Sequence, residues 1–301
     1  MGYIMGNKLI IDIGTNSIKY FRFLPQNRKW ELINKGKIEN RLGDGIAEQG
    51  LISRYAIDSC INTIKQILLS VGYDNCACKA FGTEVFRAAK NANEVIETIK
   101  RETNIEIQIL TQKQELEIYW KGLIRDFDYD GIIAAIDIGG GSVQFMYGNK
   151  KGLQGCHYLK TGALFVRNQF IKSEPPTVEE YLLIERYIKQ QIESITVQFP
   201  PETPYIHGST SVIDFYTEAK LNLVPNNCSI THPYKIDLGD TREFYHKLRT
   251  LPRGERVKYF PSEPGFTDGA SIGMANVLLI AEKTGLSYEI PSNNSIIQGF
   301  L

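Results

Sequence analysis

The sequence contains one short polar motif twice, and its residue types are suited to binding phosphate. Ile11–Ser17 reads I-D-I-G-T-N-S and Ile136–Ser142 reads I-D-I-G-G-G-S, identical at five of seven positions and 125 residues apart. Backbone N–H groups of a glycine turn can surround a phosphate group without obstruction by side chains. The aspartates that precede the turns, Asp12 and Asp137, could hold Mg²⁺, which would offset phosphate charge. Together the two turns predict a clamp for a phosphate chain.

Both motifs have the pattern of a strand, a tight turn and a second strand. Each follows an apolar run, Leu9–Ile13 or Ile132–Ile138, and each precedes alternating apolar and polar residues. Two such hairpins, about one domain apart, predict a duplicated fold with two similar halves that face each other. The alternative for each motif alone is an ordinary hairpin, because D-x-G is common in turns.

The segments around the motifs alternate between helical and strand patterns. Ser53 is a candidate N-cap of a helix whose apolar residues recur every three or four positions until Gly72. Thr111 begins a helix that runs to about Leu123, with Gln114 at capping-box spacing. The other expected elements are strands at Ala77–Phe81, Ile105–Leu110, Ile132–Ile138, Val143–Tyr147, Leu153–Tyr158 and Tyr205–Gly208, and helices at Asn93–Thr103, after Thr177 and at Asp268–Thr284. This mixed order predicts an α/β protein.

Chain length suggests two domains. At 301 residues the chain is long for one compact domain. The polar stretch Arg125–Gly131 is the expected boundary, which gives domains at residues 1–125 and 126–301, with the last helix packing back on the first domain.

Composition and charge exclude several classes of protein. The 34 basic and 34 acidic residues give a formal net charge of zero, which argues against a polybasic arm and a nucleic-acid partner. The apolar runs are too short for a membrane span, no secretory signal is present, and the five cysteines are an odd number. A cytoplasmic protein with reduced thiols is expected. Cys76 and Cys78 have no second cysteine or histidine cluster nearby, so burial is a better interpretation than a zinc site.

The motifs as a set resemble a known family. The two turns look like the phosphate-1 and phosphate-2 loops of the actin, sugar-kinase and heat-shock-chaperone ATPase superfamily. Within it, the chain is similar to the Ppx/GppA family of exopolyphosphatases and guanosine pentaphosphate phosphohydrolases, through Arg41–Gly43 (R-L-G), Thr83–Asn91 (T-E-V-F-R-A-A-K-N) and Thr161–Ala163 (T-G-A). The resemblance implies two ribonuclease-H-like (actin-like ATPase) α/β domains facing an interdomain cleft.

The resemblance also implies an activity. A family member would release a terminal phosphate from inorganic polyphosphate or guanosine pentaphosphate, assisted by Mg²⁺ or Mn²⁺. Because about 300 residues leave no room for further domains and a neutral chain lacks a broad attractive field, short polyphosphates or nucleotides are the expected substrates. A homodimer is left open.

Individual roles follow by matching positions to the family's motifs. Glu115 matches the catalytic carboxylate, which would accept a proton from the attacking water. The alternative role of Glu115 is that of a solvated helix residue. Arg87 would contact a substrate phosphate, and its alternative role is to form a surface salt bridge. The expected phosphate-binding residues are Gly14, Thr15, Asn16, Ser17, Arg87, Gly139, Gly140, Gly141, Ser142, Ser209 and Thr210, and the expected metal ligands are Asp12, Asp137 and Gln144.

Four positions depart from the family's pattern. Gln144 stands where a glutamate is expected near the metal, Phe266 replaces an arginine, Gln112 replaces a glycine, and the third loop reads His207-Gly208-Ser209-Thr210 instead of G-x-G-G-T. A neutral ligand should weaken the binding of a hard cation. Two further functions therefore stay open: an ATP-dependent kinase or ATPase of the same superfamily, and a catalytically weak binder of polyphosphate or of the stringent-response nucleotide.

Overall fold

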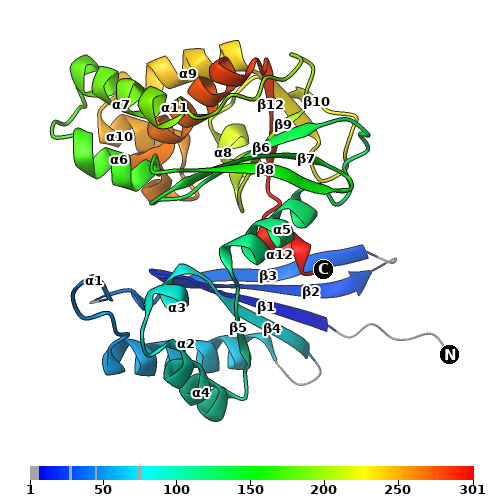
Figure 1. The fold of residues 1–301 in the computed structure, drawn as a ribbon, viewed down its shortest axis with the longest axis vertical. Helices are drawn as coiled ribbons and strands as arrows, with labels where there is room; N and C mark the ends of the chain where they lie inside the picture. The colour runs from blue at the N-terminus through cyan, green and yellow to red at the C-terminus, as the bar shows by residue number, and fades with distance from the viewer. Residues whose placement is uncertain (1–6, 27–28, 45, 73–75) are drawn as a thin grey trace. The chain divides into compact units, whose positions relative to one another are not determined.

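The computed structural model describes residues 7–26, 29–44, 46–72 and 76–301, and it divides into two compact units (Figure 1). Unit 1 comprises Met1–Tyr119 with Phe300–Leu301, and unit 2 comprises Trp120–Gly299. The boundary expected after Arg125 lies just beyond this division. The C-terminus belongs to unit 1, where the Phe300 ring stacks on Phe81 with ring centroids 4.8 Å apart. Each unit is described by itself below.

Unit 1 is built on a five-stranded sheet in the order β3-β2-β1-β4-β5. Its strands are β1 (Asn7–Ile13), β2 (Ser17–Gln26), β3 (Lys29–Glu39), β4 (Cys76–Gly82) and β5 (Ile107–Ile109). β1, β2 and β3 pair antiparallel, whereas β1, β4 and β5 pair parallel. The carboxyl ends of the three parallel strands therefore meet at one edge, because Ile13 pairs with Gly82 and Gly82 pairs with Ile109.

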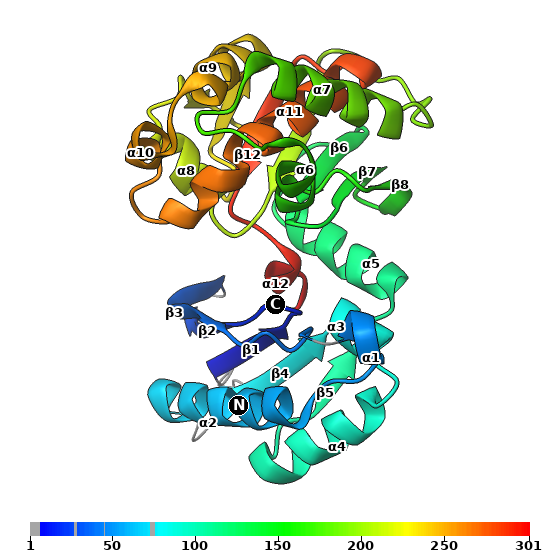
Figure 2. The same cartoon turned by 90° about the vertical axis from the view of Figure 1, so that its left-hand side faces the viewer.

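The helices of unit 1 include the three that the sequence predicts. They are α1 (Ile46–Gln49), α2 (Arg54–Val71), α3 (Glu84–Ala88), α4 (Ala92–Thr103) and α5 (Gln112–Leu123), which continues into unit 2. The Ser53 hydroxyl accepts from the Ala56 N–H to cap α2, and Gly72 ends it in the left-handed conformation. α2 and α4 lie on the same face of the sheet (Figures 1 and 2), where they bury apolar residues against β1 and β2.

Unit 2 repeats this strand order and extends it. Its seven-stranded sheet has the order β10-β11-β12-β9-β6-β7-β8. Its strands are β6 (Ile133–Ile138), β7 (Val143–Asn149), β8 (Gly152–Leu159), β9 (Tyr205–Gly208), β10 (Val224–Pro225), β11 (Tyr234–Asp237) and β12 (Tyr288–Ser292). Five of these strands, in the order β8-β7-β6-β9-β12, pair in the same way as β3-β2-β1-β4-β5 of unit 1. In both sets the first two pairs are antiparallel and the next two pairs are parallel. This shared order is that of a ribonuclease-H-like fold, so the predicted fold class is confirmed.

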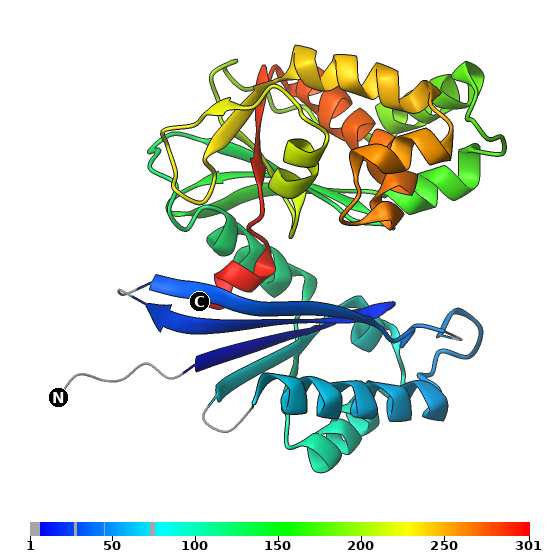
Figure 3. The ribbon, with the colours of Figure 1, turned by 180° about the vertical axis from the view of Figure 1, so that it is seen from behind.

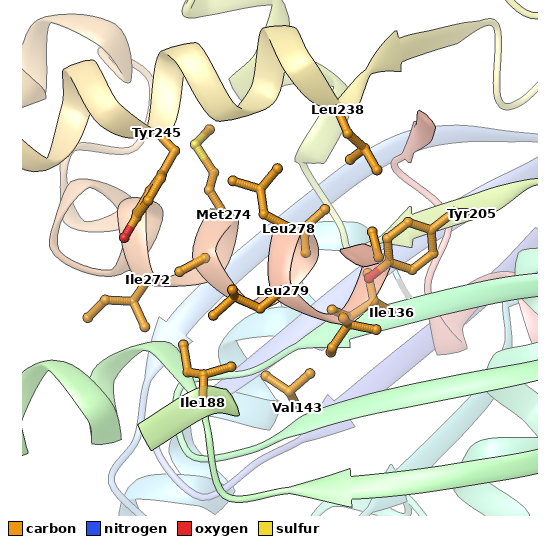
Figure 4. Packing of buried hydrophobic residues seen from close by; sticks show 14 of the residues in the cluster. Ile136, Val143, Ile188, Tyr205, Leu238, Tyr245, Ile272, Met274, Leu278 and Leu279 are labelled. Atoms are coloured by element: carbon orange, nitrogen blue, oxygen red, sulfur yellow. The ribbon is translucent and has the colours of Figure 1, made fainter. Parts of the chain in front are cut away.

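The core of unit 2 lies between its sheet and a layer of helices (Figure 3). The helices of this layer are α6 (Ala163–Phe170), α7 (Val178–Gln191), α8 (Val212–Glu218), α9 (Leu238–Thr250), α10 (Arg253–Arg256) and α11 (Thr267–Thr284). α12 (Ile296–Gly299) lies apart from them, beside α5 (Figure 1). Figure 4 shows Leu279 of α11 on the side toward Ile188 of α7 and Val143 of the sheet, whereas Leu278 lies on the side of Met274; all belong to one buried cluster. The small residues of α11 allow this close packing, and most of the helix is buried.

Local sequence signals were most accurate at turns and caps and least accurate at the sheet edges. The capping box at Thr177 and Glu180 is present, as is the reciprocal pairing of Thr111 with Gln114. The strand expected at Ile105–Leu110 is only Ile107–Ile109. The sequence analysis had no prediction for β3 or for β10 to β12. Among the described residues, no helix is both long enough and apolar enough to cross a membrane.

Candidate phosphate-binding and catalytic site

The two repeated motifs form the same turn. The Gly14 N–H donates to the Ser17 carbonyl at 3.0 Å, and the Gly139 N–H donates to the Ser142 carbonyl at 2.9 Å. Each turn joins two antiparallel strands, as predicted from the sequence. A Cβ on Gly141 would meet open space, and Gly140 and Gly141 are exposed. An anion could therefore approach the backbone of this turn directly.

Neighbouring segments hold the carbonyl groups of both turns. In unit 1 the Gly43 N–H donates to the Thr15 carbonyl at 2.9 Å. In unit 2 the carbonyl at the corresponding position, Gly140, accepts from Leu164 and Phe165 in the first turn of α6. The amides of Gly140 and Gly141, in contrast, donate to no other residue of the described part of the chain. The turn carbonyls are thus already hydrogen-bonded to neighbouring segments, whereas the amides of Gly140 and Gly141 remain able to donate to an anion.

These bracing segments tolerate only glycine at the contact. A Cβ on Gly43 would lie 2.2 Å from the Thr15 side chain, and one on Gly162 would lie 2.2 Å from the backbone of Gly141 and of Ser142. The R-L-G and T-G-A segments thus have a physical role, which is to fix the two turns from outside.

Asp12 lies at the carboxyl edge of the first sheet beside two charged groups. It pairs across β1 and β2 with Lys19. Burial raises the pKa of Asp12 to about 6, with Lys19 lowering it and the negative charge of Glu115 raising it further. The two carboxylates are therefore close enough to interact, as the sequence-based assignment requires. Lys19 was missed by the sequence analysis, although the 125-residue offset aligns it with Gln144.

Glu115 is held by an arginine from another helix. The Arg87 guanidinium of α3 donates to the Glu115 carboxylate and to the Leu110 carbonyl, with N···O distances of 2.8 and 2.7 Å. The Glu115 side chain is 35% exposed and that of Arg87 is 30% exposed. Arg87 and Glu115 thus form a partly exposed ion pair between two helices, which is the arrangement given above as the alternative for Arg87. The pair lies just beyond the carboxyl ends of β4 and β5.

In unit 2, Asp137 pairs across the hairpin with Gln144. The Gln144 Nε2 donates to the Ser142 hydroxyl at 2.8 Å, so the amide oxygen is the atom left for a cation. Asp137 also pairs with Gly208 of β9, and the Ser209 N–H donates to the Ser292 carbonyl at 3.1 Å. The third loop therefore begins one strand away from Asp137, with Ser209 and Thr210 half-buried.

A buried polar network supports the strand that leads into the third loop. Glu289 is fully buried and accepts from the Tyr216 hydroxyl at 3.1 Å and from the Thr241 hydroxyl at 2.7 Å. The His207 Nδ1 lies 3.3 Å from both the Glu289 carboxylate and the Tyr216 hydroxyl. Burial and the Glu289 charge raise the pKa of Tyr216 well above its usual value, so the phenol stays a donor. These contacts connect β9 to β12, α8 and α9.

Phe266 has a structural role in place of the arginine expected there. Its ring stacks on Phe215 with centroids 3.7 Å apart and meets the Phe260 ring edge-on at 5.2 Å. Phe266 therefore belongs to an aromatic cluster at the start of α11. Unlike the arginine of the family's motif, it supplies no positive charge.

The donor atoms at the two turns are few for a divalent cation held by protein alone. Within the described residues, no group of three or more His, Cys, Asp or Glu side chains could hold a metal. Asp12 and Asp137 are each half-buried at a turn, with the Gln144 oxygen opposite Asp137. One or two carboxylates are the usual protein contribution to Mg²⁺, which takes its other ligands from water and substrate phosphates. The residues fit Mg²⁺ held together with substrate.

The predicted site residues gather in two groups, one in each unit. Unit 1 brings together Asp12, Glu115 and Arg87, with the turn Gly14–Ser17 at the end of β1. Unit 2 brings Gly139–Ser142 with Asp137, Gln144 and the start of the third loop.

Comparison with known proteins places these features in a family. A model of the Ppx/GppA phosphatase family matches residues 25–276. The bifunctional 3-dehydroquinate synthase/phosphatase of Fusobacterium nucleatum is 28% identical over 172 residues, which are 53% of this chain and 26% of that protein. Exopolyphosphatase 1 of Mycobacterium bovis is 24% identical over 194 residues, or 62% of this chain and 56% of that protein. The matched regions thus span about a quarter and just over half of these curated relatives.

Solved structures share the fold over nearly the whole chain. The Aquifex aeolicus Ppx/GppA phosphatase has a TM-score of 0.84 at 22% identity, covering 98% of this chain and 97% of that one. An exopolyphosphatase from Cytophaga hutchinsonii has a TM-score of 0.75 at 20% identity, covering 97% and 96%.

Proposed function

Because this chain belongs to the Ppx/GppA phosphatase family, we propose that it hydrolyses a terminal phosphoanhydride bond, of inorganic polyphosphate or of guanosine pentaphosphate. The observation that carries the proposal is the charged group Asp12, Arg87 and Glu115 beside the turn Gly14–Ser17. Such a group can bind phosphate, hold a cation and accept a proton at one edge of one sheet.

Glu115 is proposed to orient the attacking water and take its proton. A carboxylate suits this step because phosphoryl transfer needs a positioned nucleophile and offset charge more than covalent chemistry. Arg87 keeps the Glu115 side chain in place through the 2.8 Å contact. It is also proposed to contact a substrate phosphate, since its remaining donors can do so.

The backbone amides of the turn Gly14–Ser17 in unit 1, and those of Gly139–Ser142 with Ser209 and Thr210 in unit 2, are proposed to bind phosphate groups of the substrate. Asp12, Asp137 and the Gln144 oxygen would hold Mg²⁺, which supplies positive charge to the transferring phosphoryl group when bound. Short substrates are proposed, because a chain with a formal net charge of zero lacks a broad field that would attract a long polyanion.

Glu115→Gln is the test of this proposal. The variant removes the proton acceptor but keeps size and hydrogen bonding, so phosphate release from tripolyphosphate should fall about a hundredfold or more. The matched control is Glu117→Gln, two residues along the same helix, whose carboxylate pairs with exposed Lys113. Release is measured with Mg²⁺ on tripolyphosphate, long polyphosphate and guanosine pentaphosphate.

The same assay separates the alternatives. Equal turnover by the Glu115→Gln and Glu117→Gln variants would contradict the role of Glu115. Tight substrate binding by the unaltered chain without any phosphate release would select the second candidate, a weak or inactive binder. That candidate is favoured by one observation, the neutral Gln144 opposite Asp137. ATP-dependent transfer to an acceptor would instead select a kinase.

A further inference from the structure

Unit 2 contains a pocket that none of the proposed roles uses. Its volume is about 220 Å³, which is below the range of about 300–1,000 Å³ that is usual for drug-sized ligands. It lies among α6, the segment that leads to α7, the first turn of α7, α10 and the first two turns of α11. None of its lining residues belongs to the glycine turns or to the third loop. We propose that this pocket binds a small oxyanion of the phosphate class, at a site separate from that of the proposed hydrolysis.

The pocket has an excess of cationic groups without a carboxylate partner. Arg167, Lys172 and Arg256 line it together with the acids Glu174 and Asp268. Both acids are already paired: Glu174 with Arg256 at 3.2 Å, and Asp268 with Arg253 at 2.9 Å.

The two remaining cations are bound only by neutral groups. The Arg167 guanidinium donates to the Asn168 side chain at 3.3 Å, and the Lys172 Nζ donates to the Asn168 carbonyl at 2.7 Å. Neither forms an ion pair with any residue in the described part of the chain. An anion in the pocket would therefore meet positive charge that no protein carboxylate offsets.

A buried arginine provides the second observation. Arg256 is 4% exposed, and its terminal nitrogens donate to the Leu251 carbonyl at 3.0 Å and to Glu174. Its Nε has no hydrogen-bond partner among the described residues. A buried donor without an acceptor is costly, and because Arg256 lines the pocket, a shift of its side chain on binding would let an oxyanion oxygen accept from this Nε.

Neutral donors line the same space. The Tyr181 and Ser271 hydroxyls are buried and lie 2.6 Å apart, so one of the two protons joins them and the other is free to point at a ligand. Guanidinium, ammonium and hydroxyl donors around a small space match a tetrahedral oxyanion. Two sources share this chemistry: free inorganic phosphate, and the terminal phosphoryl group of a longer compound.

The test compares two double variants of the full chain that lose the same charge. Arg167→Gln with Lys172→Gln removes the unpaired cations of the pocket. Arg186→Gln with Lys189→Gln removes an arginine and a lysine from the exposed face of α7. Binding of inorganic phosphate is measured by calorimetric titration at constant ionic strength set with chloride. Phosphate bound at the glycine turns contributes equally to all three proteins, so the comparison isolates the pocket.

The pocket variant should bind phosphate about tenfold more weakly, or with one site fewer, than the unaltered chain and the control variant. Equal affinity and stoichiometry in the two double variants would overturn the proposal. If the pocket variant loses its folded circular dichroism spectrum, Lys172→Gln alone is used, because that side chain is exposed; a fall in affinity supports the site and an unchanged affinity contradicts it.

A second titration distinguishes the two sources of the anion. Tripolyphosphate is added in the Glu115→Gln background without divalent cation, so that it is not consumed. Pocket-dependent binding that is tighter for tripolyphosphate assigns the site to a terminal phosphoryl group, and tighter binding of inorganic phosphate assigns it to the free ion. Because binding is read without turnover, a chain without hydrolase activity could still bind at the pocket, and the two proposals fail separately.

Discussion

The Arg87 guanidinium of α3 donates to the Glu115 carboxylate of α5 at 2.8 Å, and the same nitrogen donates to the Leu110 carbonyl at the end of β5. Arg87 thus connects α3 to the end of β5 and to α5. These groups lie at the edge of the sheet where Asp12 also lies. The Glu115 carboxylate, which is proposed to orient the attacking water and accept its proton, is therefore held in position before substrate binds. Efficient proton transfer requires such positioning.

Arg87→Met should lower kcat by about tenfold to a hundredfold, because a side chain displaced by about an ångström loses alignment with the reacting group. If Arg87 also contacts substrate phosphate, KM rises as well. Steady-state kinetics on tripolyphosphate measure both constants. Lys113→Met on α5 is the control, since this exposed lysine pairs only with Glu117. Kinetics of Arg87→Met that match those of Lys113→Met would argue against both roles.

Gln144→Glu should increase the affinity for Mg²⁺. The change adds a negative charge opposite Asp137, and the half-saturating Mg²⁺ concentration should fall about tenfold because cation affinity rises with the number of charged ligands. Activity or calorimetry as a function of Mg²⁺ concentration measures this. Gln154→Glu adds the same charge at an exposed position of β8 and should leave the Mg²⁺ requirement unchanged. An identical Mg²⁺ dependence in both variants would remove Gln144 from the metal site.

Gly162→Ala should impair phosphate binding without unfolding the chain. The added Cβ would press on the backbone of Gly141 and Ser142, which must move, so kcat/KM should fall about tenfold to a hundredfold. Gly254→Ala introduces the same methyl group into open space within unit 2 and serves as the control. Circular dichroism confirms that both variants are folded. Full activity in Gly162→Ala would show that the second turn does not need this brace.

Asp126→Asn should destabilise unit 2 in a way that depends on pH. Asp126 accepts from the Thr231 N–H and from the Ser229 and Thr231 hydroxyls, and it lies 3.6 Å from His232. Burial alone would raise the pKa of Asp126, but hydrogen bonds from His232, Thr231 and Ser229 hold it well below its usual range. Its contribution to stability is therefore complete above the pKa of the unfolded chain and is lost as pH falls toward the lower pKa of the folded state.

The expected loss of unfolding free energy in Asp126→Asn is about 1–3 kcal/mol at pH 7, from thermal or denaturant unfolding. The difference between this variant and the unaltered chain should shrink below about pH 4, where carboxyl groups of the unfolded chain become protonated. Asp130→Asn, at a 94% exposed side chain, is the control with little expected effect. A difference that stays constant from pH 7 to pH 3 would contradict the pH-dependent part of the prediction.

Features formed between sequence neighbours were predictable from the sequence. The turns at Gly14 and Gly139, the caps at Ser53 and Gly72, and the capping box at Thr177 depend on residues at most a few positions apart. A glycine, a hydroxyl or a carboxylate at the correct spacing has the same local geometry wherever it occurs. The repeat of one turn at a fixed offset was therefore enough to predict two similar halves and their strand order around each turn.

Tertiary structure decided which groups meet across longer distances. Nothing near Arg87 in the sequence identifies Glu115 as its partner, since the pairing depends on the register of β4 beside β5. The same holds for the buried Glu289 and for Arg256, whose partners come from other elements. The sequence by itself determined the turns and the chemistry they favour, because those depend on local backbone geometry. Only the fold determined which charges are paired and which remain available to a ligand, because pairing depends on contacts between distant segments.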